Sequence, residues 1–263
     1  GEDRDRQALA ERKHRAKEGL FRIEGVRLSE MAAASGWAIR FGLYTAELVE
    51  KERGRALVEA LQAKCPLYEI GAALAKKVAA TDTPQGIFLV AEQQKKSLPQ
   101  MAEHLQQATA RKPLLVVLDG VQDPGNAGTI IRTADAVGAD GVILTKGSVD
   151  VFSDKTVRAT MGSLFHLPVV TDVSAEEVAA FAQATGCQLL ATALDEQAKP
   201  HFAVDFGKGS LIAFGNEGGG VSKELLATAE KVYIPMYGEA ESLNVGVSSA
   251  VVLYEAVRQR CFA

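Results

Sequence analysis

The 263-residue sequence lacks several features that would assign it to a common class of protein. No apolar run approaches the roughly 18 residues that a membrane helix needs, and residues 1–19 contain no apolar segment typical of a secretion signal. The three cysteines are far apart and form no C-x-x-C motif, so neither a structural disulfide nor a zinc site is expected. These absences predict a cytoplasmic protein with no bound metal and no membrane partner.

An excess of basic residues is lacking as well, because the formal net charge is −4. This charge argues against a protein that coats nucleic acid without specificity. Basic residues nevertheless concentrate between Arg4 and Arg22, where seven Lys or Arg residues and His14 occur. The concentration has two interpretations, an arm that binds RNA or the solvated face of a helix.

Residues 20–91 alternate short apolar runs with helical patterns, which is typical of a small α/β domain. The pattern predicts a helix through 31–34, a long helix over 47–63 and a short helix over 72–80. The apolar runs predict four strands, at residues 21–23, 38–44, 67–70 and 87–90. The polar stretch 92–112 contains Pro99 and predicts a linker with one short helix.

Residues 113–263 contain further apolar runs with helical patterns between them. These runs predict six strands, at residues 114–118, 141–144, 167–170, 188–193, 211–214 and 232–234. Short strands that alternate with helices form a mostly parallel sheet with helices on both faces. The chain is therefore expected to have an α/β fold, with ligands at the carboxyl ends of its strands.

Turn-forming residues follow the first of these six strands. The tetrapeptide Asp123 to Asn126 predicts a turn whose last residue caps a helix, and Gly128 leaves room beside the first helical turn. Arg132 comes six residues after Asn126 and is expected on roughly the same side of this helix. A purely structural interpretation, in which Asn126 caps and Arg132 is a surface cation, stays open for this segment taken alone.

A glycine-rich loop follows the strand at 211–214. Four of its six residues are glycine, at 215, 218, 219 and 220, so little side chain would separate a ligand from the backbone. Neither G-x-G-x-x-G nor G-x-x-x-x-G-K-[ST] fits, and Glu217 would repel a phosphate, so a phosphate site is disfavoured. A cationic ligand or a ribose hydroxyl suits this acid better, while a merely structural loop remains open.

Polar residues also follow the last predicted strand. Ser242 is a natural N-cap for the final helix, and Asn244 would lie in its first turn. Together the three segments closely resemble the signature motifs of the SpoU/TrmH family of RNA ribose methyltransferases. The matching motifs are N-x-G-x-x-x-R at 126–132, G-N-E-G at 215–218, I-P-M at 234–236 and S-L-N at 242–244.

Two more stretches are similar to this family. Residues 157–169 match through Arg158, Gly162 and Pro168, and residues 13–28 resemble the start of a small substrate-binding domain. The chain departs from many relatives at Gly246, where they have Ser.

The resemblance implies a fold and a set of partners. Residues 113–263 would form a SPOUT α/β domain with a mostly parallel sheet, a deep C-terminal trefoil knot and a homodimer interface. A small N-terminal α/β ribosomal-protein-like domain over 20–91 would bind RNA, with a basic arm over 1–19 before it and a linker over 92–112 after it. S-adenosyl-L-methionine would be the methyl donor, and the substrate would be structured RNA, with ribosomal RNA ahead of transfer RNA.

The resemblance also implies roles for individual residues. Arg132 would contact the target phosphate and 2′-hydroxyl, and because a guanidinium stays protonated near neutral pH, a phosphate clamp suits it better than a general base. Asn126 and Asn244 would orient the loops and the RNA, Ser242 would support them, and Glu217 would hold the donor side. The implied cofactor contacts are Thr192, Gly215, Asn216, Gly218, Ile234, Met236, Leu243 and Asn244.

Rival functions make different demands on the sequence. An RNA-binding relative that lost catalysis would not need Asn126, Arg132, Glu217, Ser242 and Asn244, all of which are present. A nucleotide-dependent oxidoreductase would need the dinucleotide motif that is missing here. A Ser-His-Asp hydrolase is disfavoured because none of the four histidines lies in a recognisable nucleophile context.

Overall fold

The computed structural model describes residues 10–108 and 111–262, and it divides the chain into two compact units. The N-terminal unit comprises Gly1–Gln94 and Asp150–His166, and the C-terminal unit comprises Lys95–Val149 and Leu167–Ala263. Of the basic arm expected over 1–19, residues 1–9 lie outside the described residues. Within the described ranges, no helix is long and apolar enough to span a membrane.

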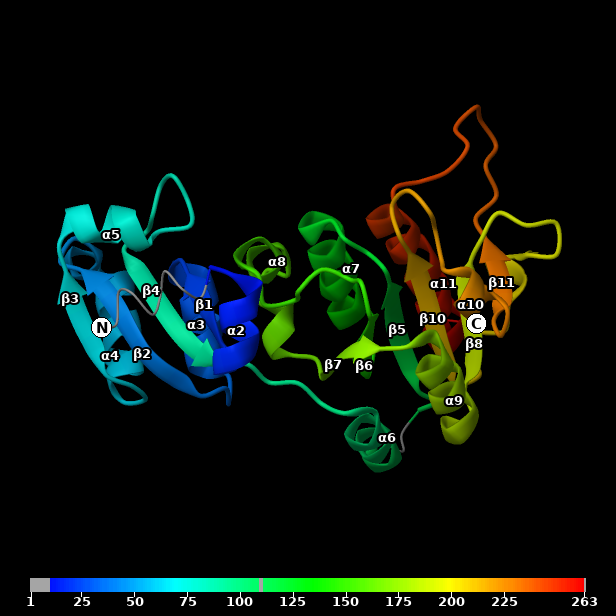
Figure 1. Ribbon diagram of the computed structural model, residues 1–263, viewed down its shortest axis with the longest axis horizontal. Helices are drawn as coiled ribbons and strands as arrows, with labels where there is room; N and C mark the ends of the chain where they lie inside the picture. Colours follow the sequence, from blue (N-terminus) through cyan, green and yellow to red (C-terminus); the bar gives the residue numbers. More distant parts are fainter. Residues whose placement is uncertain (1–9, 109–110, 263) are drawn as a thin grey trace. The chain divides into compact units, whose positions relative to one another are not determined.

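The N-terminal unit is built on a four-stranded sheet in the order β1-β4-β2-β3 (Figure 1). Its strands are β1 (Leu20–Glu24), β2 (Ile39–Thr45), β3 (Leu67–Ile70) and β4 (Ile87–Glu92). Strand β4 runs antiparallel to both neighbours, whereas β3 is parallel to β2. The helices are α2 (Arg12–Glu18), α3 (Val26–Ala34), α4 (Glu52–Gln62) and α5 (Ala72–Val78). The four strands predicted from the apolar runs are confirmed.

The long helix predicted over 47–63 is wrong at its beginning. The chain first forms the 3-10 helix η1 (Leu48–Glu50), takes an extended conformation at Lys51, and only then enters α4. A Cβ atom on Gly54 would lie 2.0 Å from the carbonyl oxygen of Leu48, which is far inside contact distance. This glycine therefore allows η1 to pack directly on the first turn of α4, a close approach that helical periodicity does not show.

Residues 150–166 fold with the N-terminal unit, although the sequence places them inside the expected methyltransferase domain. They form α8 (Asp154–Ala159) and η2 (Ser163–Phe165). The ring of Phe152 lies 4.9 Å from that of Phe21, and the ring of Phe165 lies 5.1 Å from that of Trp37, centroid to centroid. This segment therefore shares an aromatic core with β1 and the residues before β2.

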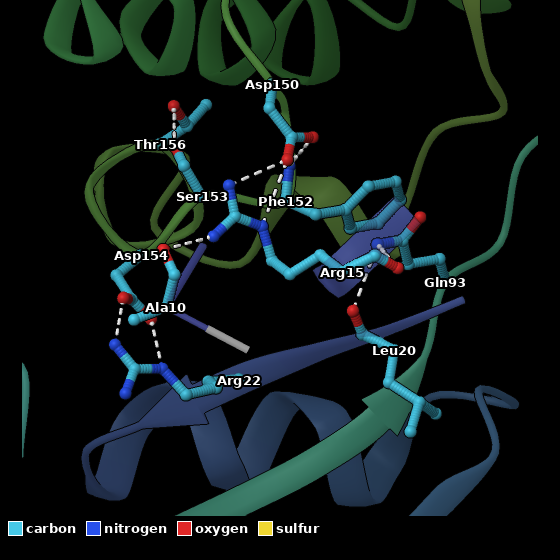
Figure 2. Close-up of polar contacts among 10 residues, drawn as sticks. All are labelled: Ala10, Arg15, Leu20, Arg22, Gln93, Asp150, Phe152, Ser153, Asp154 and Thr156. Carbon is cyan, nitrogen blue, oxygen red and sulfur yellow. Dashed lines mark hydrogen bonds and ion pairs between the residues drawn. The ribbon is translucent and has the colours of Figure 1, made fainter. Parts of the chain in front are cut away.

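Two ion pairs join the same segment to the basic N-terminal residues (Figure 2). Arg15 donates from Nε and Nη2 to Oδ2 of Asp150 at 3.0 and 2.9 Å, and Arg22 pairs with Asp154. The side chains of Arg15 and Arg22 are only 5% and 7% exposed. These two cations of the basic concentration are thus committed to internal pairs and are not available to bind RNA.

The C-terminal unit contains a seven-stranded sheet in the order β7-β6-β5-β10-β8-β11-β9, and every neighbouring pair is parallel. The strands are β5 (Leu114–Asp119), β6 (Gly141–Thr145), β7 (Val169–Val173), β8 (Gln188–Thr192), β9 (Lys199–Pro200), β10 (Ser210–Gly215) and β11 (Glu230–Tyr233). The predicted parallel sheet is confirmed, but the prediction missed β9, which is too short to show a pattern.

Helices cover both faces of this sheet. They are α6 (Leu98–Gln107), α7 (Pro124–Ala136), α9 (Ala175–Thr185), α10 (Lys223–Leu226) and α11 (Val245–Phe262). Buried residues of α6, α9 and α10 share one core with Leu115 and Val117 of β5. Side chains alternate along a strand, so Val116 faces the other side, where α7 contacts β5 and α11 packs against α7. The two helices that carry the first and third motifs therefore lie together.

Candidate active site

A cavity of about 530 Å³ opens at the carboxyl ends of β8, β10 and β11. The lining residues come from these strand ends, the glycine-rich loop, the start of α7 and the segment that leads into α11. They are Asn126, Thr192, Ala193, Leu194, Gly215, Asn216, Glu217, Gly218, Gly219, Gly220, Val232, Tyr233, Ile234, Met236, Ser242, Leu243, Asn244, Val245 and Ser248. The cavity thus brings together residues from all three sequence motifs.

The glycine-rich loop is shaped by Asn216. Its side-chain oxygen accepts hydrogen bonds from the backbone N–H groups of Gly218 and Gly219, both at 2.9 Å, and its Nδ2 donates to the carbonyl oxygen of Gly120 at 2.9 Å. A Cβ atom on Gly215 would lie 2.1 Å from the carbonyl carbon of Gly220, so glycine is required there. Because its carboxamide already serves the loop, Asn216 faces a ligand mainly through its backbone.

Glu217 ties this loop to the residues that precede α7. Its carboxylate accepts hydrogen bonds from the backbone N–H groups of Gln122 at 3.2 Å and Asp123 at 2.9 Å, and from Nδ2 of Asn126 at 3.4 Å. Partial burial acts to raise the pKa of Glu217, but the hydrogen bonds outweigh it and hold the pKa below its ordinary value. The carboxylate is therefore kept ionised by groups of the protein itself.

Asn126 and Asn244 continue the network to the last helix. Nδ2 of Asn244 donates to Oδ1 of Asn126 at 3.0 Å, and Oδ1 of Asn244 accepts from the backbone N–H groups of Gly246 and Val247 at 2.8 and 3.2 Å. A continuous set of hydrogen bonds therefore runs from Glu217 through both asparagines into α11. The position of each motif depends on the other two.

Both predicted helix caps need correction. Helix α7 begins at Pro124, and its N-cap is Asp123, whose carboxylate accepts from the backbone N–H of Asn126 at 2.8 Å. Helix α11 begins at Val245, and Asn244 binds its free N–H groups instead of Ser242. The cap of α7 lies three residues before the predicted position, and the cap of α11 lies two residues after it. Neither Asn126 nor Ser242 therefore caps a helix, and both line the cavity.

The structure separates Arg132 from the other predicted residues. Arg132 is exposed on α7 and is not among the residues that line the cavity. Six residues turn an α-helix by about 600°, so Arg132 projects about 120° away from Asn126, and the expectation of a shared side is wrong. Ser242 does line the cavity, and its hydroxyl makes no hydrogen bond to the residues that the structure describes.

The charge of the lining restricts the ligand. Among the described residues around the cavity, Glu217 is the only one with a charged side chain, and Lys, Arg and His are absent. A ligand with phosphates would meet one negative charge and no cation, whereas a cationic sulfonium would be favoured. The cavity therefore fits S-adenosyl-L-methionine better than a dinucleotide or ATP.

Several lining residues were missed by the sequence analysis. Ala193 and Leu194 follow Thr192 at the end of β8, and Tyr233 ends β11 beside it in the sheet. Ligands of parallel sheets bind at the carboxyl ends of the strands, and this rule identifies all three residues when it is applied to every strand. Val245 and Ser248 were missed because they lie within α11, where a helical pattern gives no sign of a ligand.

Comparison with known proteins places this geometry in a family. The model of the SpoU rRNA Methylase family matches residues 113–254, and the model of the MRM3-like substrate binding domain matches residues 4–89. The chain belongs to the SpoU rRNA methylase family. The first match covers the cavity and all three motifs, and the second covers most of the N-terminal unit.

Relatives of this family member are similar over both units. The 23S rRNA (guanosine(2553)-2′-O)-methyltransferase RlmP of Bacillus subtilis is 37% identical over 95% of this chain and 94% of its own length. The 23S rRNA (uridine(2479)-2′-O)-methyltransferase of Streptomyces viridochromogenes is 34% identical over 96% and 87%.

A solved structure agrees with these sequence matches. The crystal structure of the SpoU methyltransferase AviRb from Streptomyces viridochromogenes, in complex with the cofactor AdoMet, has a TM-score of 0.88 and 32% identity. The match covers 100% of this chain and 99% of the AviRb chain.

Proposed function

We propose that this SpoU family member transfers a methyl group from S-adenosyl-L-methionine to a ribose 2′-hydroxyl of ribosomal RNA. The observation that carries the proposal is the cavity in which all three motifs meet around a single acid, Glu217. Ribosomal RNA is favoured over transfer RNA because the two relatives named above act on 23S rRNA and resemble both units of this chain. The N-terminal unit would then bind the RNA around the target.

The cavity suits the proposed donor in size as well as in charge. Its volume of about 530 Å³ lies within the range of roughly 300–1,000 Å³ that is typical of small-molecule sites. Gly215, Ile234 and Leu243 would hold the adenine and ribose through backbone groups. When bound, S-adenosyl-L-methionine supplies an electrophilic methyl group.

Catalysis in this cavity would depend on positioning. Among the described lining residues, Glu217 is the only acid. Its carboxylate already accepts hydrogen bonds from backbone and side-chain donors, so it is poorly placed to accept a proton from the ribose. Asn126 and Ser242 would orient the 2′-oxygen in line with the methyl group, and the walls would exclude water. As the O–C bond forms, the S–C bond of the donor would break and leave a neutral thioether, and the proton of the hydroxyl would pass to water at the mouth of the cavity.

Arg132 is the residue that would bind the phosphate beside the target ribose. It is exposed, and it makes no ion pair with the residues that the structure describes. We expect Arg132→Ala to lose nearly all turnover in a tritiated-methyl transfer assay, while calorimetry shows unchanged affinity for S-adenosyl-L-methionine.

Lys208→Ala is a suitable control for this experiment, because Lys208 precedes β10 at the amino end of the sheet, opposite the cavity. It should retain full activity. Full activity in Arg132→Ala would refute the role of the arginine, and failure of the wild-type chain to bind the donor would refute the proposed function.

A homodimer is part of the proposal, and α11 offers a surface for it. The side chains of Val247 and Tyr254 are 50% and 52% exposed, and their spacing of seven residues places them on one side of the helix. Apolar side chains aligned in this way are typical of an interface. In analytical ultracentrifugation the wild type should sediment as a dimer and Val247→Asp as a monomer. A wild type that sediments as a monomer would exclude the homodimer.

A trefoil knot is the other part of the proposal that rests on α11. The start of α11 is bonded to Asn126, and at its other end Arg260 donates to the carbonyl oxygens of Lys112, Pro113, Phe206 and Lys208. A helix anchored at both ends to distant segments is consistent with threading. If the chain is knotted, pulling its termini in optical tweezers should give a contour length shorter than that of an unknotted chain.

A further inference from the structure

A second cavity, of about 330 Å³, lies wholly within the N-terminal unit. Its walls come from the turn between β1 and α3, the loop between α5 and β4, and the inserted segment 150–166. They are formed by Glu24, Gly25, Arg27, Leu28, Thr81, Thr83, Gln85, Arg158 and Met161. Arg158 belongs to the fourth stretch that resembles the family, and the methyl-transfer cavity gives this residue no role.

The cations of this second cavity make few contacts with the residues that the structure describes, although the charge of Arg27 acts on the nearby carboxylate of Glu30. Among the described residues, neither Arg27 nor Arg158 makes a side-chain hydrogen bond, and Nη1 of Arg158 is buried without one. The one acid, Glu24, already accepts from the backbone N–H of Ala80 at 2.9 Å and from Oγ1 of Thr81 at 3.0 Å. Two guanidinium groups without hydrogen-bond partners, beside one carboxylate that already accepts two hydrogen bonds, favour an anion such as a phosphate.

Another part of the wall is apolar, and its backbone has an unusual conformation. Met161 is 46% exposed, and its φ of 52° lies in the left-handed region, which is uncommon for a residue other than glycine. Gly162 follows with a φ of 90°. This pair of residues holds the thioether of Met161 at the cavity beside Leu28, and a thioether makes favourable contacts with aromatic rings.

We propose that this cavity binds one unpaired nucleotide of the RNA substrate, with its phosphate on Arg27 and Arg158 and its base against Met161. Sequence-specific recognition of RNA mostly targets unstacked nucleotides of this kind, whose bases stack on aromatic side chains or guanidinium planes. Here the thioether of Met161 would take the place of such a plane. A bare anion would leave the apolar wall unused. The inference rests on the proposed function, because it takes RNA as the substrate.

The four methionines of the chain provide a test. Met161 lines the second cavity, Met236 lines the methyl-transfer cavity, and the other two methionines line neither. The full chain is labelled with ¹³C-methyl methionine, and the signals are assigned with Met161→Leu and Met236→Leu. S-adenosyl-L-methionine should shift the Met236 signal, which tests the proposed function by itself. Guanosine or uridine 5′-monophosphate, added after the donor, should then shift the Met161 signal saturably.

Matched variants decide whether the second cavity is responsible. Arg158→Gln and Arg27→Gln should each weaken binding of the nucleotide about tenfold, as expected for loss of a hydrogen bond to a charged group. Arg40→Gln should not, because Arg40 is an exposed cation of the same unit that pairs with Glu92 outside the cavity. An unmoved Met161 signal, an equal response to inorganic phosphate, or unchanged affinity in Arg158→Gln would each overturn the inference.

Discussion

The pair formed by Arg15 and Asp150 should contribute strongly to the stability of the N-terminal unit. Two N–H groups of Arg15 converge on one oxygen of Asp150, and the side chains are only 5% and 14% exposed. Removing one partner of a buried pair costs about 3–5 kcal/mol, because the other charge stays buried without compensation. Since Asp150 retains some contact with water, we expect about 2–3 kcal/mol for Asp150→Asn.

Urea unfolding can measure this loss through the single tryptophan of the chain. Trp37 packs against Phe165 and Phe152 of the inserted segment, so its fluorescence reports the N-terminal unit. With a slope of about 2 kcal/mol per molar urea, the midpoint should fall by about 1 M. The double variant Arg15→Gln with Asp150→Asn should lose much less free energy of unfolding than the two single variants lose in sum.

The exposed pair between Arg53 and Glu30 is the matched control in the same unit. Its side chains are 63% and 37% exposed, so Glu30→Gln should cost less than about 1 kcal/mol. Raising the salt concentration to about 1 M should weaken this exposed pair and leave the buried one almost unchanged. A loss below about 1 kcal/mol for Asp150→Asn, or strictly additive single changes, would refute this account of the buried pair.

Three further outcomes are expected at the methyl-transfer cavity. Asn126→Ala removes the link between Glu217 and Asn244 and should lower kcat/KM on RNA about tenfold or more, with the fold intact by circular dichroism. Gly215→Ala places a methyl group against Gly220 and should abolish donor binding in calorimetry. The pKa of Glu217 is lowered in the folded protein, so the stabilising effect of its hydrogen bonds is complete above the ordinary glutamate pKa of about 4.3. This effect is lost as the pH falls below that value. Donor affinity should therefore fall at such a pH in the wild type but not in Glu217→Gln.

The sequence predicted the sheet of each unit because strand formation there depends on local apolar runs. Strands β5 and β10 are buried at every position, so their runs stand out from the polar loops around them. Strand β9 escaped prediction because it has two residues, Lys199 and Pro200, and owes its place only to pairing with β11.

The sequence indicates the candidate site most clearly where the backbone itself is constrained. Gly215 and the loop after it are dictated by close backbone contacts, and such glycines are visible in the sequence. The helix caps were misplaced because Asp123, Asn126 and Ser242 all have side chains that can cap, and only the tertiary contact between Asn126 and Asn244 decides among them. The pairing of Arg15 with Asp150, 135 residues apart, had no local signal at all.

Residues 150–166 have a consequence for how such chains can be recombined. The chain passes between the two units after residues 94, 149 and 166, so no single cut separates them. A fragment that ends at residue 112 would keep Arg15 and Arg22 but lose the aspartates that neutralise them. Exchange of the N-terminal half between relatives should therefore yield a folded protein only when residues 150–166 are inherited with it.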